Sequence, residues 1–115
     1  MKNQNKINVI GGGLAGCEAA YQISKLGIDV DLYEMRPNTK TEAHNTEYLA
    51  ELVCSNSFRS DDKEYNAVGV LHEELRMSDS LIMKTADLNK VPAGSALAVD
   101  RDDFAKEINN TIKSN

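Results

Sequence analysis

The 115-residue chain contains no apolar run that approaches the ~20 residues needed to cross a membrane. Its first residues, MKNQNK, lead directly into a short apolar segment and lack the hydrophobic core of a signal peptide. Basic residues are the minority, 13 against 18 acidic residues, and the net charge is −5. This balance argues against a nucleic-acid-binding surface formed by this segment alone. We therefore expect a cytoplasmic protein with no membrane partner.

Cysteine is also scarce, with only Cys17 and Cys54 in the sequence. A structural disulfide is not expected in a chain without an export signal, and the spacing fits no zinc-site pattern. The acidic and imidazole side chains of His72, Glu73 and Glu74 fit the solvated face of a helix, because no second cluster completes a metal site. The sequence therefore predicts no metal centre.

What the sequence does contain is a strand, a glycine turn, a helix and a second strand in succession. The turn satisfies G-x-G-x-x-G at Gly11, Gly13 and Gly16. Gly11 lets the chain leave the strand sharply, Gly13 leaves room for a pyrophosphate at the backbone, and Gly16 lets the helix pack closely on the strands. The phosphates would lie at the helix N-terminus, where free N–H groups and the macrodipole favour negative charge. The predicted pyrophosphate loop comprises Gly11, Gly12, Gly13, Leu14, Ala15 and Gly16.

The flanking segments support this interpretation. Apolar periodicity predicts strands over residues 7–10 and 28–33 and a helix over residues 14–26. Glu34 ends the second strand, 18 residues after Gly16, where a carboxylate can accept hydrogen bonds from ribose hydroxyls. Both NAD and FAD contain an adenosine ribose, so Glu34 does not separate them. The predicted fold class is α/β, a Rossmann-like FAD/NAD(P)-binding fold.

The remaining residues predict an incomplete version of that fold. We expect a short helical turn near residues 49–53, a long helix over 66–84, a short strand over 96–99, and a helix capped by Asp100. Together these give two clear parallel strands, a short third strand and three main helices. A dinucleotide-binding fold normally has about five or six parallel strands. Residues 1–115 are therefore expected to be the N-terminal, truncated part of a larger enzyme.

Cys54 admits two interpretations. It precedes a turn-forming Ser-Asn-Ser sequence and lies near Arg59, and a thiol close to a cation can ionise and act as a nucleophile. Free cysteine is also among the most buried residue types. Residue chemistry alone favours a buried structural cysteine at this position. Cys17, one residue after Gly16, is interpreted as a small helix residue.

Several separate stretches resemble one family. The segments INVIGGGLAGCEAA, LYEMRP, AELVCSNSFRS, NAVGVLHEEL, DSLIM and VPAGSALAVDRDDF are similar to the N-terminal portion of the folate-dependent tRNA (uracil-5-)-methyltransferases, the TrmFO family. LYEMRP, ELVCSNS and VPAGSALAVDR are more specific than the glycine motif, which many families share. This chain departs from the usual family pattern at Gly12, Cys17, Ser95 and residues 42–45.

The resemblance implies a reaction and its cofactors. Such enzymes transfer a methylene carbon from methylenetetrahydrofolate to C5 of a uridine in the T-loop of tRNA, and FAD reduced by NADPH or NADH supplies the reducing equivalents. Gly11 to Gly16 then look like the FAD pyrophosphate loop, Glu34 like the ribose ligand, and Arg36 lies beside the adenosine. Cys54 matches the active-site cysteine of the family. The resemblance therefore favours a catalytic role over a buried structural cysteine. Its role is either thiolate addition to the pyrimidine or handling of the flavin–methylene adduct.

Two other functions stay open at this point. One is an FAD- or NAD(P)-dependent oxidoreductase of a small molecule, and the other is a non-catalytic nucleotide-binding fragment. Members of the family are several times longer than this chain and hold the rest of the cofactor and tRNA sites in their additional length. We therefore expect the 115 residues alone to lack methyltransferase activity.

Overall fold

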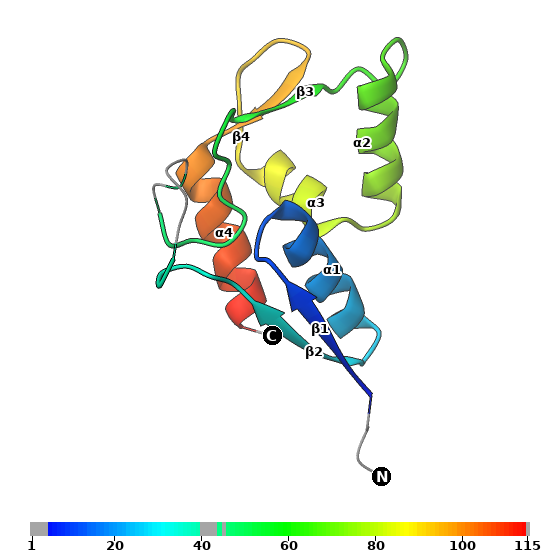
Figure 1. Ribbon diagram of the computed structural model, residues 1–115. Coiled ribbons are helices and arrows are strands. Elements are labelled where there is room, and N and C mark those ends of the chain that lie inside the picture. The colour runs from blue at the N-terminus through cyan, green and yellow to red at the C-terminus, as the bar shows by residue number, and fades with distance from the viewer. Residues whose placement is uncertain (1–4, 40–43, 45, 115) are drawn as a thin grey trace.

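The computed structural model describes residues 5–39, 44 and 46–114. Within them the fold is α/β, with the two sheets near opposite ends of the molecule and α3 and α4 between them (Figure 1). The elements in chain order are β1 (Lys6–Ile10), α1 (Leu14–Lys25), β2 (Asp29–Tyr33), β3 (Ser57–Ser60), α2 (Ala67–Met77), α3 (Leu81–Leu88), β4 (Lys90–Val91), β5 (Ala96–Val99) and α4 (Arg101–Lys113).

The predicted strand–turn–helix–strand unit is confirmed, with bounds that differ by one residue at most. β1 and β2 pair in parallel, with Ile7 opposite Val30 and Ile10 opposite Tyr33. α1 packs on this pair, and its first turn comes very close to the end of β1. A Cβ at Gly16 would lie 1.8 Å from the carbonyl oxygen of Gly11, so a side chain there would push the helix off the strands.

The sequence predicted one strand of the second sheet but not the sheet itself. The strand expected over residues 96–99 is present as β5, but it pairs antiparallel with β3 and β4 and is not a third parallel strand. The side chain of Asn56 extends the β5 edge, because its Nδ2 donates to the carbonyl oxygen of Val99 at 3.0 Å. Sequence periodicity indicates a strand but does not name its partner, and both partners here come from segments with turn-like composition.

The prediction of one long helix over residues 66–84 is wrong, because two helices occupy this stretch. α2 ends at Met77 and α3 begins at Leu81. Between them Asp79 has φ 60°, in the left-handed region that a helix cannot contain. Glu18 of α1 fixes the new start, since its carboxylate accepts the N–H groups of Leu81 at 2.9 Å and Ile82 at 3.2 Å. The N-cap is Ser80, whose hydroxyl accepts the N–H of Met83 at 3.2 Å, and Glu18, 63 residues before Leu81, adds to this cap.

The core forms where α1, α3, α4 and β5 meet. The predicted cap of α4 is confirmed, because the Asp100 carboxylate accepts the N–H of Asp103 at 3.0 Å. Phe104 and Ile108 on the expected face are fully buried. The short helical turn expected near residues 49–53 is absent: Leu49 and Ala50 form a turn and pack into this core. Part of the loop expected over residues 38–46 lies outside the described residues.

A buried charge cluster joins α2 to the segment that precedes it. His72 was expected on a solvated helix face, but it is only 4% exposed and its Nδ1 lies 2.9 Å from Asp61 Oδ1. Arg76 donates to both carboxylate oxygens of Asp61, at 2.9 and 3.0 Å. Burial opposes the ionisation of Asp61, but the hydrogen bonds from His72 and Arg76 outweigh it and lower its pKa. The prediction failed because the partner of His72 lies outside the helix.

Candidate functional site

The glycine turn has one open side. Gly11 has φ +102°, the left-handed region that favours glycine, and a Cβ at Gly11 or Gly13 would meet no atom within 4 Å. Gly13 is the N-cap of α1, and in the described part of the chain no side chain caps this end. The first turn of α1 carries no acidic residue. Its free N–H groups and the helix macrodipole therefore face an unobstructed space that suits an anion.

Glu34 stands beside this turn. Its Oε1 accepts the N–H of Gly12 at 3.0 Å, and its Oε2 accepts the N–H of Arg36 at 3.2 Å as well as the guanidinium Nε. Desolvation opposes ionisation of Glu34, but the bonds from Arg36 and Gly12 prevail, so the pKa is lowered and the group is a carboxylate at neutral pH. It borders a crevice of about 420 Å³ lined by Ile10, Gly11, Tyr33, Glu34 and Met35.

Gly12 faces the opposite way and is buried. Its carbonyl oxygen accepts the N–H of Ala50 at 2.8 Å and the thiol of Cys17 at 3.4 Å. A Cβ at Gly12 would lie 2.5 Å from Leu49 Cδ2, so an alanine there would require this flexible side chain to move. The structure thus places Gly12 behind the turn, where it ties the turn to the segment around Ala50. Gly11 and Gly13 are on the exposed side, with Ala15.

Arg36 is also turned inward. It is 6% exposed and its guanidinium lies between two carboxylates, those of Glu34 and Glu51. Its Nη1 is 3.6 Å from Glu51 Oε1 and donates to the carbonyl oxygen of Thr46 at 3.4 Å. Arg36 therefore holds Glu34 in place and does not line the crevice of about 420 Å³, although with Glu34 it borders a second hollow of about 380 Å³. Sequence reasoning did not single out Glu51, whose only signal was its place inside the family-specific segment ELVCSNS.

Cys54 is exposed, so the interpretation as a buried structural cysteine is wrong. It lines a hollow of about 320 Å³ with Leu14, the first residue of α1, and with Glu51. The accessible thiol and the glycine turn are therefore neighbours, joined by the Ala50–Gly12 hydrogen bond. Cys17 shows the opposite behaviour: it is fully buried, and burial together with the charge of Glu34 raises its pKa to about 11.

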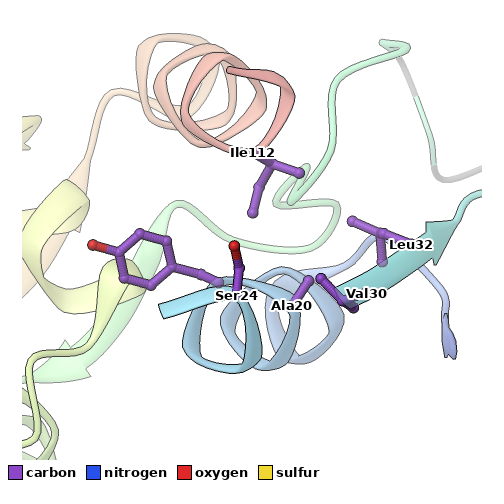
Figure 2. Close-up of a pocket in the computed structure, with 6 residues that line it drawn as sticks. Ala20, Ser24, Val30, Leu32 and Ile112 are labelled. Carbon is purple, nitrogen blue, oxygen red and sulfur yellow. The ribbon is translucent and has the colours of Figure 1, made fainter. Parts of the chain in front are cut away.

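A separate hollow of about 170 Å³ lies between α1, β2 and α4. Figure 2 shows Ala20 and Ser24 of α1, Val30 and Leu32 of β2, and Ile112 of α4 around it. All of its lining residues are uncharged, and none of them borders the crevice beside Glu34. Its polar side-chain groups are the hydroxyls of Tyr21 and Ser24, and no charged side chain lines it.

The described residues contain neither a metal-binding cluster nor a membrane-spanning helix. Residues 5–39, 44 and 46–114 contain no group of three or more His, Cys, Asp or Glu side chains placed to hold a metal ion. No helix among these residues is long and apolar enough to cross a bilayer. The candidate site in the described residues brings together the uncapped N-terminus of α1, the carboxylate of Glu34 and the exposed thiol of Cys54.

Proteins similar to this chain are known. A protein of Bartonella henselae is 64% identical over 113 residues, which are 98% of this chain and 24% of that protein. Proteins of Rhizobium meliloti (63% over 110 residues, 96% of this chain, 23% of that protein) and Mesorhizobium japonicum (58% over 112 residues, 97% and 24%) are also similar. All three are named methylenetetrahydrofolate–tRNA-(uracil-5-)-methyltransferase TrmFO.

The chain spans about a quarter of the length of these curated relatives. The segments that carried the resemblance in the sequence lie inside the aligned region, which covers nearly the whole chain. Residues 6–115 also match the family described as glucose inhibited division protein A. Because this match extends from β1 through the whole of α4, the chain belongs to the glucose inhibited division protein A family.

Proposed function

We propose that the whole protein is an FAD-dependent methylenetetrahydrofolate–tRNA (uracil-5-)-methyltransferase and that this chain provides the seat for the ADP half of FAD. The observation that carries the proposal is the open turn at Gly13 beside the ionised carboxylate of Glu34. Backbone N–H groups at a helix N-terminus suit a diphosphate, and a carboxylate suits a ribose diol. Relatives that are 58–64% identical carry this enzyme name.

The residues present fit the adenosine diphosphate of the cofactor. Gly11 and Gly13 leave open space beside the start of α1, and no side chain caps the first N–H groups of that helix. Glu34 accepts the ribose hydroxyls at the mouth of the crevice. When bound and reduced by NADPH or NADH, FAD supplies the reducing equivalents that convert a transferred methylene into a methyl group.

Cys54 is the catalytic residue in this proposal. Its exposed thiol lies on a hollow that reaches the start of α1, close to the proposed diphosphate seat. A thiolate there provides covalent activation, and a uridine from the T-loop of tRNA reaches it once unstacked. The chain is acidic, with a net charge of −5, so the tRNA docks in this proposal mainly on regions outside these 115 residues. The reaction takes place in the cytoplasm.

The proposal has a two-part test. First, titration of ADP and FAD into the chain should show binding at one site, and no binding of either would contradict the proposed seat. Second, the full-length protein should transfer labelled carbon from methylenetetrahydrofolate to a T-loop transcript, whereas this chain alone should not. Flavin turnover without label in the RNA would favour the small-molecule oxidoreductase.

A further inference from the structure

A buried row of charges connects the crevice beside Glu34 with the hollow around Cys54. The side chain of Arg36 is 2% exposed, and those of Glu34 and Glu51, on either side of it, are 15% and 3% exposed. Buried charges are tolerated only when they are paired, so these three groups must be placed as a unit. The unit carries two negative charges and one positive charge, and the guanidinium is shared between the two carboxylates.

The two ends of this row touch the two parts of the proposed site. At one end Glu34 borders the crevice. At the other end Glu51 lines the same hollow as Cys54, three residues further along the chain. The backbone N–H and hydroxyl of Thr46 both donate to Glu51 Oε1, so the glutamate is fixed to its own segment. A displacement of the Glu51 carboxylate therefore displaces the segment that carries Cys54.

The contacts of Arg36 are unequal. Its Nε and its backbone N–H both donate to Glu34, whereas its Nη1 lies 3.6 Å from Glu51 Oε1, beyond ordinary hydrogen-bond length. Hydroxyl groups that donate to Glu34 from the crevice would compete with Arg36 for the carboxylate charge. The guanidinium would then rely more on its second carboxylate neighbour, Glu51. A ligand that binds Glu34 would therefore shift the hydrogen bonding of Arg36 from Glu34 toward Glu51.

We propose that Glu51 is a positioning residue that couples occupancy of the Glu34 crevice to the placement of Cys54. The inference rests on the proposed function, because the occupant is the adenosine diphosphate end of the cofactor. Binding of a ribose at Glu34 strengthens the Arg36–Glu51 pair and holds the Cys54 segment against the start of α1. The thiol is therefore set in place only when the cofactor is bound.

Alkylation of Cys54 measures this coupling. Cys17 is fully buried with a pKa of about 11, so iodoacetamide reports on Cys54 alone. ADP is the probe, because it fills the diphosphate and ribose positions without a flavin ring that could cover the thiol. In the wild-type chain saturating ADP should slow alkylation at least about five-fold, the low end of common coupling between sites. In Glu51→Gln the rate should be the same with and without ADP.

Controls separate this inference from the proposed function. Glu51→Gln should still bind ADP, with an affinity reduced by no more than the same factor, because coupling is reciprocal. Glu64→Gln, at an exposed carboxylate, should behave as the wild type. If Glu51→Gln fails to fold, Thr46→Val removes the hydroxyl contact to Glu51 and should lose part of the ADP effect.

Each outcome decides between the two ideas. If calorimetry shows no ADP binding to the wild type, the proposed function fails and the coupling fails with it. If ADP binds but leaves the wild-type alkylation rate unchanged, the coupling alone is wrong. If Glu51→Gln keeps the full five-fold protection, direct cover of the thiol by ADP explains the effect and the role of Glu51 is overturned.

Discussion

Replacing Gly13 by valine tests whether the open side of the glycine turn is a diphosphate seat. Gly13 has φ −79° and ψ −164°, a conformation that any residue adopts, and a Cβ there would meet no atom within 4 Å. The change should therefore alter the free energy of unfolding by no more than ~1 kcal/mol, the scale of an N-cap substitution. The valine methyl groups would occupy the space in which the diphosphate must approach the N–H groups of α1.

The loss of binding follows from the hydrogen bonds that this approach makes possible. Losing about two bonds between backbone N–H groups and a charged phosphate, each worth ~1.5–3 kcal/mol, reduces the affinity for ADP or FAD by at least about 100-fold. Calorimetric titration measures the affinity, and thermal unfolding of the same sample measures the stability. The expected result is a folded protein that does not retain the cofactor.

Gly16→Ala is the matched control. It adds less volume than valine, but its Cβ would lie 1.8 Å from the Gly11 carbonyl oxygen, a backbone atom that cannot move without shifting α1 from β1. This variant should unfold at a clearly lower temperature. Unchanged affinity in Gly13→Val would refute the assignment of the seat, and a large loss of stability in the same variant would refute the description of the turn as open.

Three further changes have defined outcomes. Cys54→Ser should abolish methylation by the full-length protein and change the unfolding free energy by no more than ~0.5 kcal/mol, because the side chain is exposed; retained methylation would contradict its role. Glu18→Gln should cost about 1–2 kcal/mol near neutral pH, measured by urea unfolding, after allowance for its partial exposure. The pKa of Glu18 is lowered, because its hydrogen bonds outweigh its desolvation. The stability difference between wild type and Glu18→Gln should therefore be complete above pH 4.5, the ordinary pKa, and should shrink as the pH falls through the pKa of the folded protein. A difference that grows in acid would contradict the capping of α3. Gly69→Ala places a Cβ 2.2 Å from the backbone oxygen of Asp62 and should lower stability by ~1–3 kcal/mol, whereas an unchanged melting temperature would contradict this close approach.

The part of the fold that could be predicted from sequence is the part that is encoded locally. The spacing of Gly11, Gly13 and Gly16 and the alternation around them predicted β1, α1 and β2 almost to the residue. The cap at Asp100 and the apolar stripe that follows it predicted α4. In each case the signal and the structure lie within one or two turns of the chain.

The predictions that were wrong concern features that depend on contacts between distant segments. α3 begins at the local N-cap Ser80, but a carboxylate from α1 also binds its first N–H groups, and β5 pairs antiparallel because distant segments supply its partners. His72 is buried because Asp61 lies against it. The exposure of Cys54 likewise depends on how residues 49–54 fold over the glycine turn. Each of these facts rests on a contact between segments that the sequence pattern does not name.

The same division applies to the candidate site. The sequence singled out Gly13, Glu34 and Cys54 as candidates, but residue chemistry alone assigned Cys54 to the interior, and its expected catalytic role came from the family resemblance. The inward orientation of Arg36 and its pairing with Glu51 could not be predicted, because a charged pair fifteen residues apart in a loop leaves no periodic signal.

Amide NMR spectra of the 12.7 kDa chain, recorded while ADP is added, test the central claim most directly. We expect the largest chemical-shift changes at the N–H groups of Gly13, Leu14 and Ala15, with a second group of changes at Glu34. Shifts confined to other parts of the chain, or no shifts at saturating ADP, would contradict the assignment of this turn as the cofactor seat.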